Sequence, residues 1–272
     1  MDPILISFNG FQIRYFGVLL AFGLVIMFIK VRRNFLAIRL NLTREETLDW
    51  FLITFIYGVV GARIYFVLFN LDYYFNLSMN WYEVFAIWHG GLSFHGGVIF
   101  AAFSFWSLCR NRKIPFGVAS DQVVAPILIV QAFACIGSFV NGELLGTPTN
   151  SRLGIIFEYG PAAELYPNIR VHPAWIYCAL LYLVGFLFID IMSKGRLKDG
   201  FATTCYLLWY SLVQLLISFV RTPGLTLFGA DETLIMSIAG VVVSIGLIVG
   251  KRLYRKPPLG QKQFPSTRKW ST

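Results

Sequence analysis

The stretch VVAPILIVQAFACIGSFV, Val123–Val140, runs for 18 residues without a charged side chain. About 20 apolar residues in a helix cross the hydrocarbon core of a bilayer, so this stretch is long enough to form a membrane span. The sequence NGELLG, Asn141–Gly146, follows at once with an amide and a carboxylate. Because such groups are costly when unpaired in an apolar medium, Asn141 and Glu143 need partners or a function.

Apolar runs of this kind recur along the whole chain. Of its 272 residues 57% are hydrophobic and 14% are charged, which is outside the range of ordinary soluble domains. We predict an all-α fold, a polytopic membrane protein with seven transmembrane helices. The spans are expected near Ile13–Ile29, Leu48–Phe69, Leu92–Leu108, Val123–Val140, Pro173–Met192, Phe201–Val220 and Leu234–Val249.

The net charge of +9 comes from short basic blocks between the apolar runs, not from one amphipathic face. This pattern indicates membrane topology and no nucleic-acid partner. The blocks lie on alternate loops, at Lys30–Arg39, Arg110–Lys113, Lys194–Lys198 and Lys251–Lys256. The positive-inside rule then predicts an outside N-terminus, a cytoplasmic C-terminus and a short periplasmic segment between helices four and five. Residues 1–256 are expected to form a single membrane domain and residues 257–272 a flexible basic tail.

The cysteine pattern gives no sign of a disulfide framework or a metal site. The four cysteines fall in or beside apolar segments and are expected to be free thiols: Cys109, Cys135, Cys178 and Cys205. Zinc-type spacings and nucleotide-binding glycine loops are absent from the sequence. We therefore predict no metal and no cofactor.

Two basic side chains inside the predicted spans are candidates for function. Arg63 lies well within the second span and needs an anionic partner, which is either a carboxylate of the bundle or the phosphate of a bound lipid. His95 belongs to HGGLSFHGG, His89–Gly97. A histidine at a helix end often only packs, and we expect this of His89. The repeated His-Gly-Gly context favours a functional role for His95.

Polar residues form a stripe along each of two predicted spans. Steps of three and four residues place Gln131, Cys135, Ser138 and Asn141 on one helical face, and Tyr210, Gln214, Ser218 and Arg221 on another. Facing stripes predict an internal pocket, whereas hydrogen bonding between helices is the alternative for Gln131, Gln214 and Ser218 individually. With Glu143, Gly146 and His172 at its mouth, such a pocket suits an anionic lipid headgroup.

At these residues the sequence resembles the prolipoprotein diacylglyceryl transferase family, seven-span enzymes of the bacterial inner membrane. The resemblance rests on RYFG at Arg14–Gly17, GARIYFVLFN at Gly61–Asn70, SFHGG within His89–Gly97, SDQVVAPILIVQAFACIGSFVNGELLG at Ser120–Gly146 and HPAWIY at His172–Tyr177. It implies transfer of diacylglycerol from phosphatidylglycerol to the lipobox cysteine of a preprolipoprotein. The thiol attacks the glyceryl carbon and expels glycerol phosphate, without a cofactor.

The resemblance also implies roles for individual residues. The catalytic residues would be His95, Glu143 and Tyr210, and the substrate-binding residues Arg63, Ser138, Asn141, Gly146 and Arg221. The implied partners are an anionic phospholipid, in particular phosphatidylglycerol, and the preprolipoprotein signal peptide. Other membrane proteins are further candidate partners.

The sequence departs from the family pattern at several polar positions. Cys135 and Ser138 replace an arginine and an asparagine, and Gln214 and Ser218 replace an arginine and a glutamate. Phe16, Trp175 and Cys178 replace a tyrosine, a glutamine and a glutamate. Because a thiol or an amide cannot supply a lost guanidinium, two hypotheses stay open. The protein is a divergent active transferase, or it is an inactive homologue serving as a phospholipid-binding or structural subunit of a membrane complex. A small-solute transporter is disfavoured, since no inverted repeat is evident.

Overall fold

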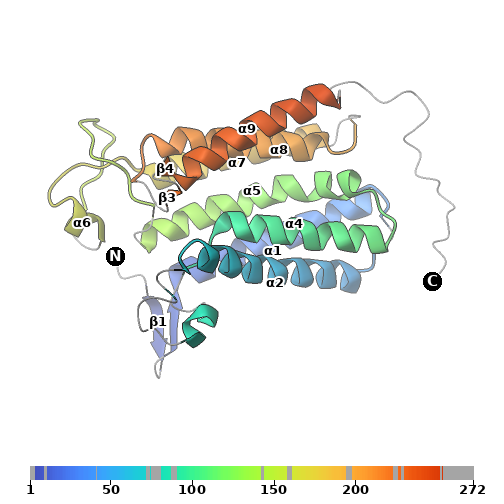
Figure 1. Cartoon of the computed structure of the whole chain (residues 1–272), viewed down its shortest axis with the longest axis horizontal. Helices are drawn as coiled ribbons and strands as arrows, with labels where there is room; N and C mark the ends of the chain where they lie inside the picture. Colours follow the sequence, from blue (N-terminus) through green and yellow to red (C-terminus); the bar gives the residue numbers. More distant parts are fainter. Residues whose placement is uncertain are drawn as a thin grey trace. The chain divides into compact units, whose positions relative to one another are not determined.

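The structure is a computed structural model and describes residues 4–8, 11–40, 42–71, 74, 81–86, 91–141, 144–157, 161–193, 198–222, 226–227, 230–251 and 253. These residues are predominantly helical, as predicted (Figure 1). The α-helices are α1 (Tyr15–Ala37), α2 (Arg44–Leu68), α4 (Phe94–Asn111), α5 (Phe116–Val140), α6 (Pro161–Leu165), α7 (Ala174–Ser193), α8 (Phe201–Ser218) and α9 (Glu232–Gly250), and η1 (Trp81–Phe85) is a 3₁₀-helix.

Six helices of the described part are long and apolar enough to cross a membrane: α1, α2, α5, α7, α8 and α9. Helix α4 covers most of the third predicted span but is not one of these six. Each of the seven predicted spans therefore overlaps a helix. The count of seven crossings, the topology and the single membrane domain with its tail stay predictions.

The first span begins later than the sequence analysis expected. Residues Phe11–Arg14 form strand β2, which pairs antiparallel with β1 (Ile4–Phe8), and α1 begins only at Tyr15. The register places Ile13 opposite Ile6. The backbone of Ile13 is therefore part of the β1–β2 hairpin and not of helix α1. A second small sheet joins β3 (Thr226–Leu227) to β4 (Ala230–Asp231) just before α9.

The chain divides into two compact units, one made of residues 32–119 and the other of residues 1–31 and 120–272. In the first, which we call the α2–α4 unit, the two long helices pack along each other. Glycines make this packing close: a Cβ on Gly61 would collide with the side chain of Phe100, and one on Gly96 with that of Tyr65. Small residues at such seams let helix backbones approach in membrane proteins.

In the second unit, which we call the α5–α9 unit, α8 packs against both α7 and α9. A buried cluster from α5, α7 and α8 forms its centre, with Leu128, Tyr182 and Ile217 almost fully enclosed. Asp121 of α5 accepts hydrogen bonds from the backbone N–H groups of Gly200 and Thr203, both at 2.8 Å. The carboxylate thereby satisfies donors that the first turn of a helix leaves unpaired, and it ties α5 to the start of α8.

Candidate functional site

Three segments meet at one end of the α5–α9 unit, where α5 and α8 end and α7 and α9 begin. Gly146 and Arg221 form an antiparallel bridge, flanked by hydrogen bonds from Thr147 N to Val220 O and from Thr222 N to Leu145 O, both 2.9 Å. The N–H of His172 donates to Thr147 O at 3.0 Å. We call this arrangement, centred on Gly146, His172 and Arg221, the loop junction. It brings together Gly146 and His172, which the sequence analysis placed at the mouth of the pocket, and Arg221, the last residue of one polar stripe.

At the loop junction, the Nη2 atom of the Arg221 side chain is held by hydrogen bonds. Its Nη2 donates to both carboxylate oxygens of Asp231, at 3.2 and 3.3 Å, and to Thr233 Oγ1 at 2.5 Å. Asp231 also accepts from Thr233 N at 2.9 Å and so caps α9. The Nε of Arg221 is buried and has no hydrogen-bond partner within the described residues. A guanidinium held this way can still donate to an added anion.

Further unpaired nitrogen atoms lie around the junction. His172 Nδ1 and Trp175 Nε1 are buried without a hydrogen-bond partner in the described part of the chain. The Trp175 ring stacks on Phe139, with ring centroids 4.3 Å apart. Gly146 leaves no room for a side chain, because a Cβ there would collide with the His172 carbonyl. Since buried polar groups are normally paired, these atoms mark a place where a polar ligand can be held.

Glutamines of the two polar stripes donate hydrogen bonds to tyrosines on neighbouring helices of the α5–α9 unit. Gln131 Nε2 of α5 donates to the hydroxyl of Tyr206 of α8 at 3.1 Å, and Gln214 Nε2 of α8 donates to that of Tyr182 of α7 at 2.8 Å. The ring of Tyr210 lies 6.2 Å from that of Tyr206 and 6.3 Å from that of Tyr182. For the two glutamines the structure supports the alternative of hydrogen bonding between helices.

Two of the departures from the family pattern lie in one buried cluster. Cys135 of α5 and Cys178 of α7 are both buried and belong to the cluster formed by α5, α7 and α8. Ser218 donates to the carbonyl oxygen of Leu215 in its own helix, at 2.8 Å. The positions where the resemblance implies charged groups are thus occupied by neutral groups, of which Gln214 and Ser218 are hydrogen-bonded within the protein.

Arg63 is bound by backbone carbonyl groups of the α2–α4 unit. Its Nε donates to Val84 O at 2.9 Å, Nη1 to Gly91 O at 3.0 Å and Nη2 to Glu83 O at 2.5 Å. The guanidinium also lies 5.3 Å from the centre of the Tyr74 ring. Arg63 lies in helix α2, at the position of a predicted membrane span, and its side chain makes these contacts while only 7% of the residue is exposed. Which of the two anionic partners proposed from the sequence Arg63 binds stays a prediction.

His95 lies close in the chain to the segment that binds Arg63. It is half-buried in the first turn of α4, and Ser93 before that helix donates its N–H to Ala62 O at 3.0 Å. Arg63 and the start of α4 are therefore joined through residues 91–93. Both predicted site residues of this unit belong to one end of the α2–α4 pair.

The other predicted residues belong to the α5–α9 unit, namely Ser138, Asn141, Gly146, Tyr210 and Arg221. Ser138 and Asn141 are half-buried, and the N–H of Asn141 continues α5 by donating to Gly137 O at 3.1 Å. Glu143 and His89 lie outside the described residues. The roles assigned to all these residues stay predictions.

Sequence reasoning missed two residues that organise the site. Asp231 stands directly before the apolar run of α9 with Glu232 after it, which is a typical start of a helix and could have been recognised. Tyr182, which accepts from Gln214, carries no such signal. A tyrosine in an apolar run shows its partner only in the folded chain.

Comparisons with known proteins show the family to which the chain belongs. The sequence model of the family described as prolipoprotein diacylglyceryl transferase matches residues 3–250. The chain belongs to this family. A protein of Listeria welshimeri is 28% identical over 261 residues, covering 95% of this chain and 92% of its own length. A protein of Staphylococcus aureus strain bovine RF122 is 30% identical over 268 residues, covering 96% and 93%.

Both relatives carry the name phosphatidylglycerol–prolipoprotein diacylglyceryl transferase. The resemblance predicted from the motifs is therefore confirmed at the level of the family. Family and relatives indicate a transferase. Together with the six candidate spans they indicate a multi-pass membrane protein.

Proposed function

We propose that this protein transfers a diacylglyceryl group from phosphatidylglycerol to the lipobox cysteine of a prolipoprotein. It would do so in a bacterial inner membrane, with the N-terminus outside and the C-terminus in the cytoplasm. The single observation that carries the proposal is the loop junction, in a chain matched by the family over residues 3–250. There Arg221 is held by Asp231, and its Nε is without a partner among the described residues.

The proposed reaction displaces glycerol phosphate from the glyceryl carbon. His95 takes the proton of the cysteine thiol, and the sulfur forms a bond to that carbon. The bond from the carbon to the phosphate oxygen breaks, and its electron pair leaves with glycerol phosphate. In this scheme Glu143 and Tyr210 orient the reacting groups. Positioning, a base and electrostatic stabilisation of the leaving group supply the rate enhancement.

Phosphate binding is proposed for two arginines that differ in their present contacts. The Nε of Arg221 is without a hydrogen-bond partner among the described residues, so Arg221 is proposed to bind the phosphate directly. Arg63 is already bonded to three carbonyl groups and would add mainly its charge. Ser138, Asn141 and the close backbone at Gly146 are proposed to bind the headgroup.

A second candidate function has an observation of its own. The buried thiols of Cys135 and Cys178 give the interior neutral groups where the family resemblance implies an arginine and a glutamate. An interior that has lost these charges fits an inactive homologue, serving as a phospholipid-binding or structural subunit of a membrane complex. This candidate keeps the lipid site but loses the chemistry.

A complementation experiment tests the proposal and separates it from the second candidate. The protein is produced in bacteria depleted of their own diacylglyceryl transferase, and a reporter lipoprotein is followed by gel shift and intact mass. We expect the mass of one diacylglyceryl group on the reporter, lost in His95→Ala and strongly reduced in Arg221→Lys. Arg152→Lys is the control for Arg221→Lys, because Arg152 is an exposed loop arginine. An unmodified reporter beside well-expressed wild-type protein would reject the transferase and favour the subunit.

A further inference from the structure

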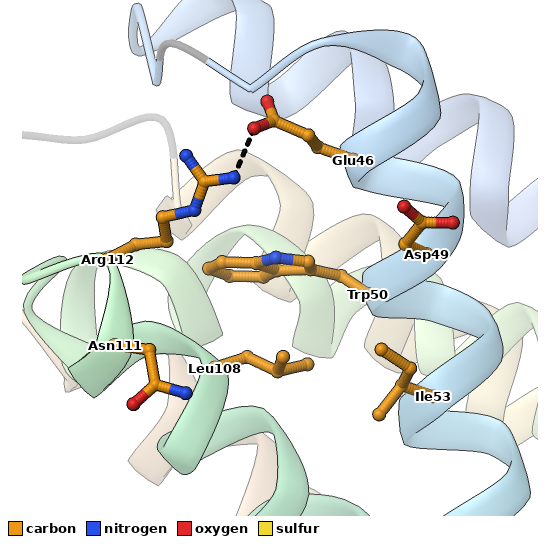
Figure 2. A pocket seen from close by; sticks show the side chains of 7 residues that line it. All are labelled: Glu46, Asp49, Trp50, Ile53, Leu108, Asn111 and Arg112. Carbon is orange, nitrogen blue, oxygen red and sulfur yellow. Dashed lines mark hydrogen bonds and ion pairs between the residues drawn. The ribbon is translucent and has the colours of Figure 1, made fainter. Parts of the chain in front are cut away.

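A pocket lies at the end of the α2–α4 unit opposite Arg63 and His95. Figure 2 shows it between the start of α2 and the end of α4, lined by Glu46, Asp49, Trp50, Ile53, Leu108, Asn111 and Arg112. The indole of Trp50 extends from α2 toward α4, beneath the ion pair of Arg112 and Glu46. Trp50 is only 6% exposed and its ring meets that of Phe105 edge-on. The pocket therefore has a rigid aromatic floor.

The charged side chains that line the pocket differ in their hydrogen bonds and ion pairs. Glu46 pairs with Arg112 and also accepts from Thr43 N at 2.8 Å in the capping box of α2. Asp49, one turn along the helix, is exposed and has no hydrogen bond or ion pair to a described residue. The lining of the pocket thus includes the Trp50 indole and a carboxylate, that of Asp49, which is unpaired among the described residues. A carboxylate near an aromatic face attracts an organic cation.

The residues around the pocket limit what can bind there. Arg44, Arg110 and Lys113 are exposed near the same helix ends, and Arg110 lies over the Trp106 ring at 5.4 Å. Because these side chains are positively charged, they do not attract a free cation from solution to the pocket. A cation must be brought to Asp49 by the molecule that carries it, and an anion at the pocket would face the Asp49 carboxylate. The best occupant is a cationic group tethered to an apolar segment.

We propose that the pocket binds a lysine or arginine of the charged N-terminal region of the prolipoprotein signal peptide. This inference rests on the proposed function and its topology, which places the pocket on the cytoplasmic side. Signal peptides carry such a cationic region before 7–15 apolar residues and then the processing site. The α2–α4 unit would thus bind both ends of the peptide that is modified.

The dimensions of the unit match this arrangement. Arg63 follows Asp49 by 14 residues in α2, and His95 precedes Asn111 by 16 residues in α4. At about 1.5 Å per residue, the pocket and the predicted catalytic end are separated by roughly 21–24 Å along the helices. A helical apolar region of 15 residues spans about 22 Å. A peptide anchored at Asp49 with an apolar region of this length therefore places its lipobox cysteine at the level of His95.

Peptide binding without turnover tests the proposal. Fluorescent signal peptides with serine in place of the lipobox cysteine are titrated onto the protein in phosphatidylcholine vesicles, which carry no net charge. One peptide has lysines in the N-terminal region and the other has norleucine. We expect the lysine peptide to bind about two- to fivefold more tightly to the wild-type protein, the range of an exposed ion pair. Asp49→Asn should abolish this preference, whereas the exposed Glu45→Gln outside the pocket should retain it.

Several results would overturn the assignment. The wild-type protein could show equal affinity for both peptides, or Asp49→Asn could keep the preference for lysine. Adding phosphatidylethanolamine could also remove the wild-type preference, which would assign the pocket to the ammonium group of a lipid. Because the serine peptides cannot be lipidated, these results are independent of catalysis. A failed complementation experiment beside an intact lysine preference would reject the proposed function alone.

Discussion

Arg221 and Asp231 lie ten residues apart and form an ion pair with both carboxylate oxygens, at 3.2 and 3.3 Å. The same carboxylate caps α9 through Thr233 N. One aspartate therefore sets the start of a helix and the direction of the arginine proposed to bind phosphate. The two roles can be separated by substitution, because asparagine caps helices about as well as aspartate but lacks its charge.

We expect Asp231→Asn to lower diacylglyceryl transfer while leaving the melting temperature nearly unchanged. Asp231→Ala should lower transfer and also cost about 1 kcal/mol of stability through the lost cap. Melting in detergent and transfer to a reporter peptide are measured for both variants. Asp199→Asn, at an exposed loop position, is the control. Full transfer by Asp231→Asn would show that the pair does not orient Arg221 for the reaction.

Gly146→Ala is expected to destabilise the loop junction. The added methyl group would collide with the His172 carbonyl, and relieving such overpacking costs about 1–3 kcal/mol. Gly246→Ala is a matched control, since a Cβ there meets open space and alanine suits a helix interior better than glycine. The melting temperature should fall for the first variant and stay level or rise for the second. Equal melting temperatures would contradict the close contact at Gly146.

The hydrogen bond from Gln131 to Tyr206 should contribute measurably to the packing of α5 on α8. Gln131→Leu, Tyr206→Phe and the double variant form a cycle that isolates the pair. The coupling energy should be about 0.6–1.7 kcal/mol, the range found for hydrogen bonds between membrane helices. Reversible unfolding in mixed micelles gives the three free energies. Additive effects of the two single variants would mean that the bond does not stabilise the protein.

Restoring charges at the buried thiol pair should work only when both are restored. Cys135→Arg and Cys178→Glu each place an unpaired charge at a site that is 8% or 2% exposed. An uncompensated buried charge costs about 3–5 kcal/mol, so we expect each single variant to be poorly stable. The double variant should recover part of this loss through an ion pair. A double variant less stable than either single one would show that the two positions no longer accept such a pair.

The helices of this protein could be predicted from its sequence because a long apolar run has few alternatives in a membrane. The polar details are harder to predict. The stripes of α5 and α8 were visible as a spacing, yet the partner of Gln214 is Tyr182 on a third helix. Arg63 donates hydrogen bonds to carbonyl groups of residues 83, 84 and 91. Because every residue has a carbonyl group, no pattern of side chains in the sequence predicts which carbonyl groups will bind Arg63.

The way Arg63 is anchored bears on how the segment that binds it can evolve. Substitutions at positions 83 and 84 leave in place the backbone carbonyl groups that accept hydrogen bonds from the guanidinium. Gly91 is constrained, because its φ of +74° favours glycine. The backbone part of this anchor does not depend on which side chains stand at positions 83 and 84. An anchor of this kind tolerates variation in the residues that supply it.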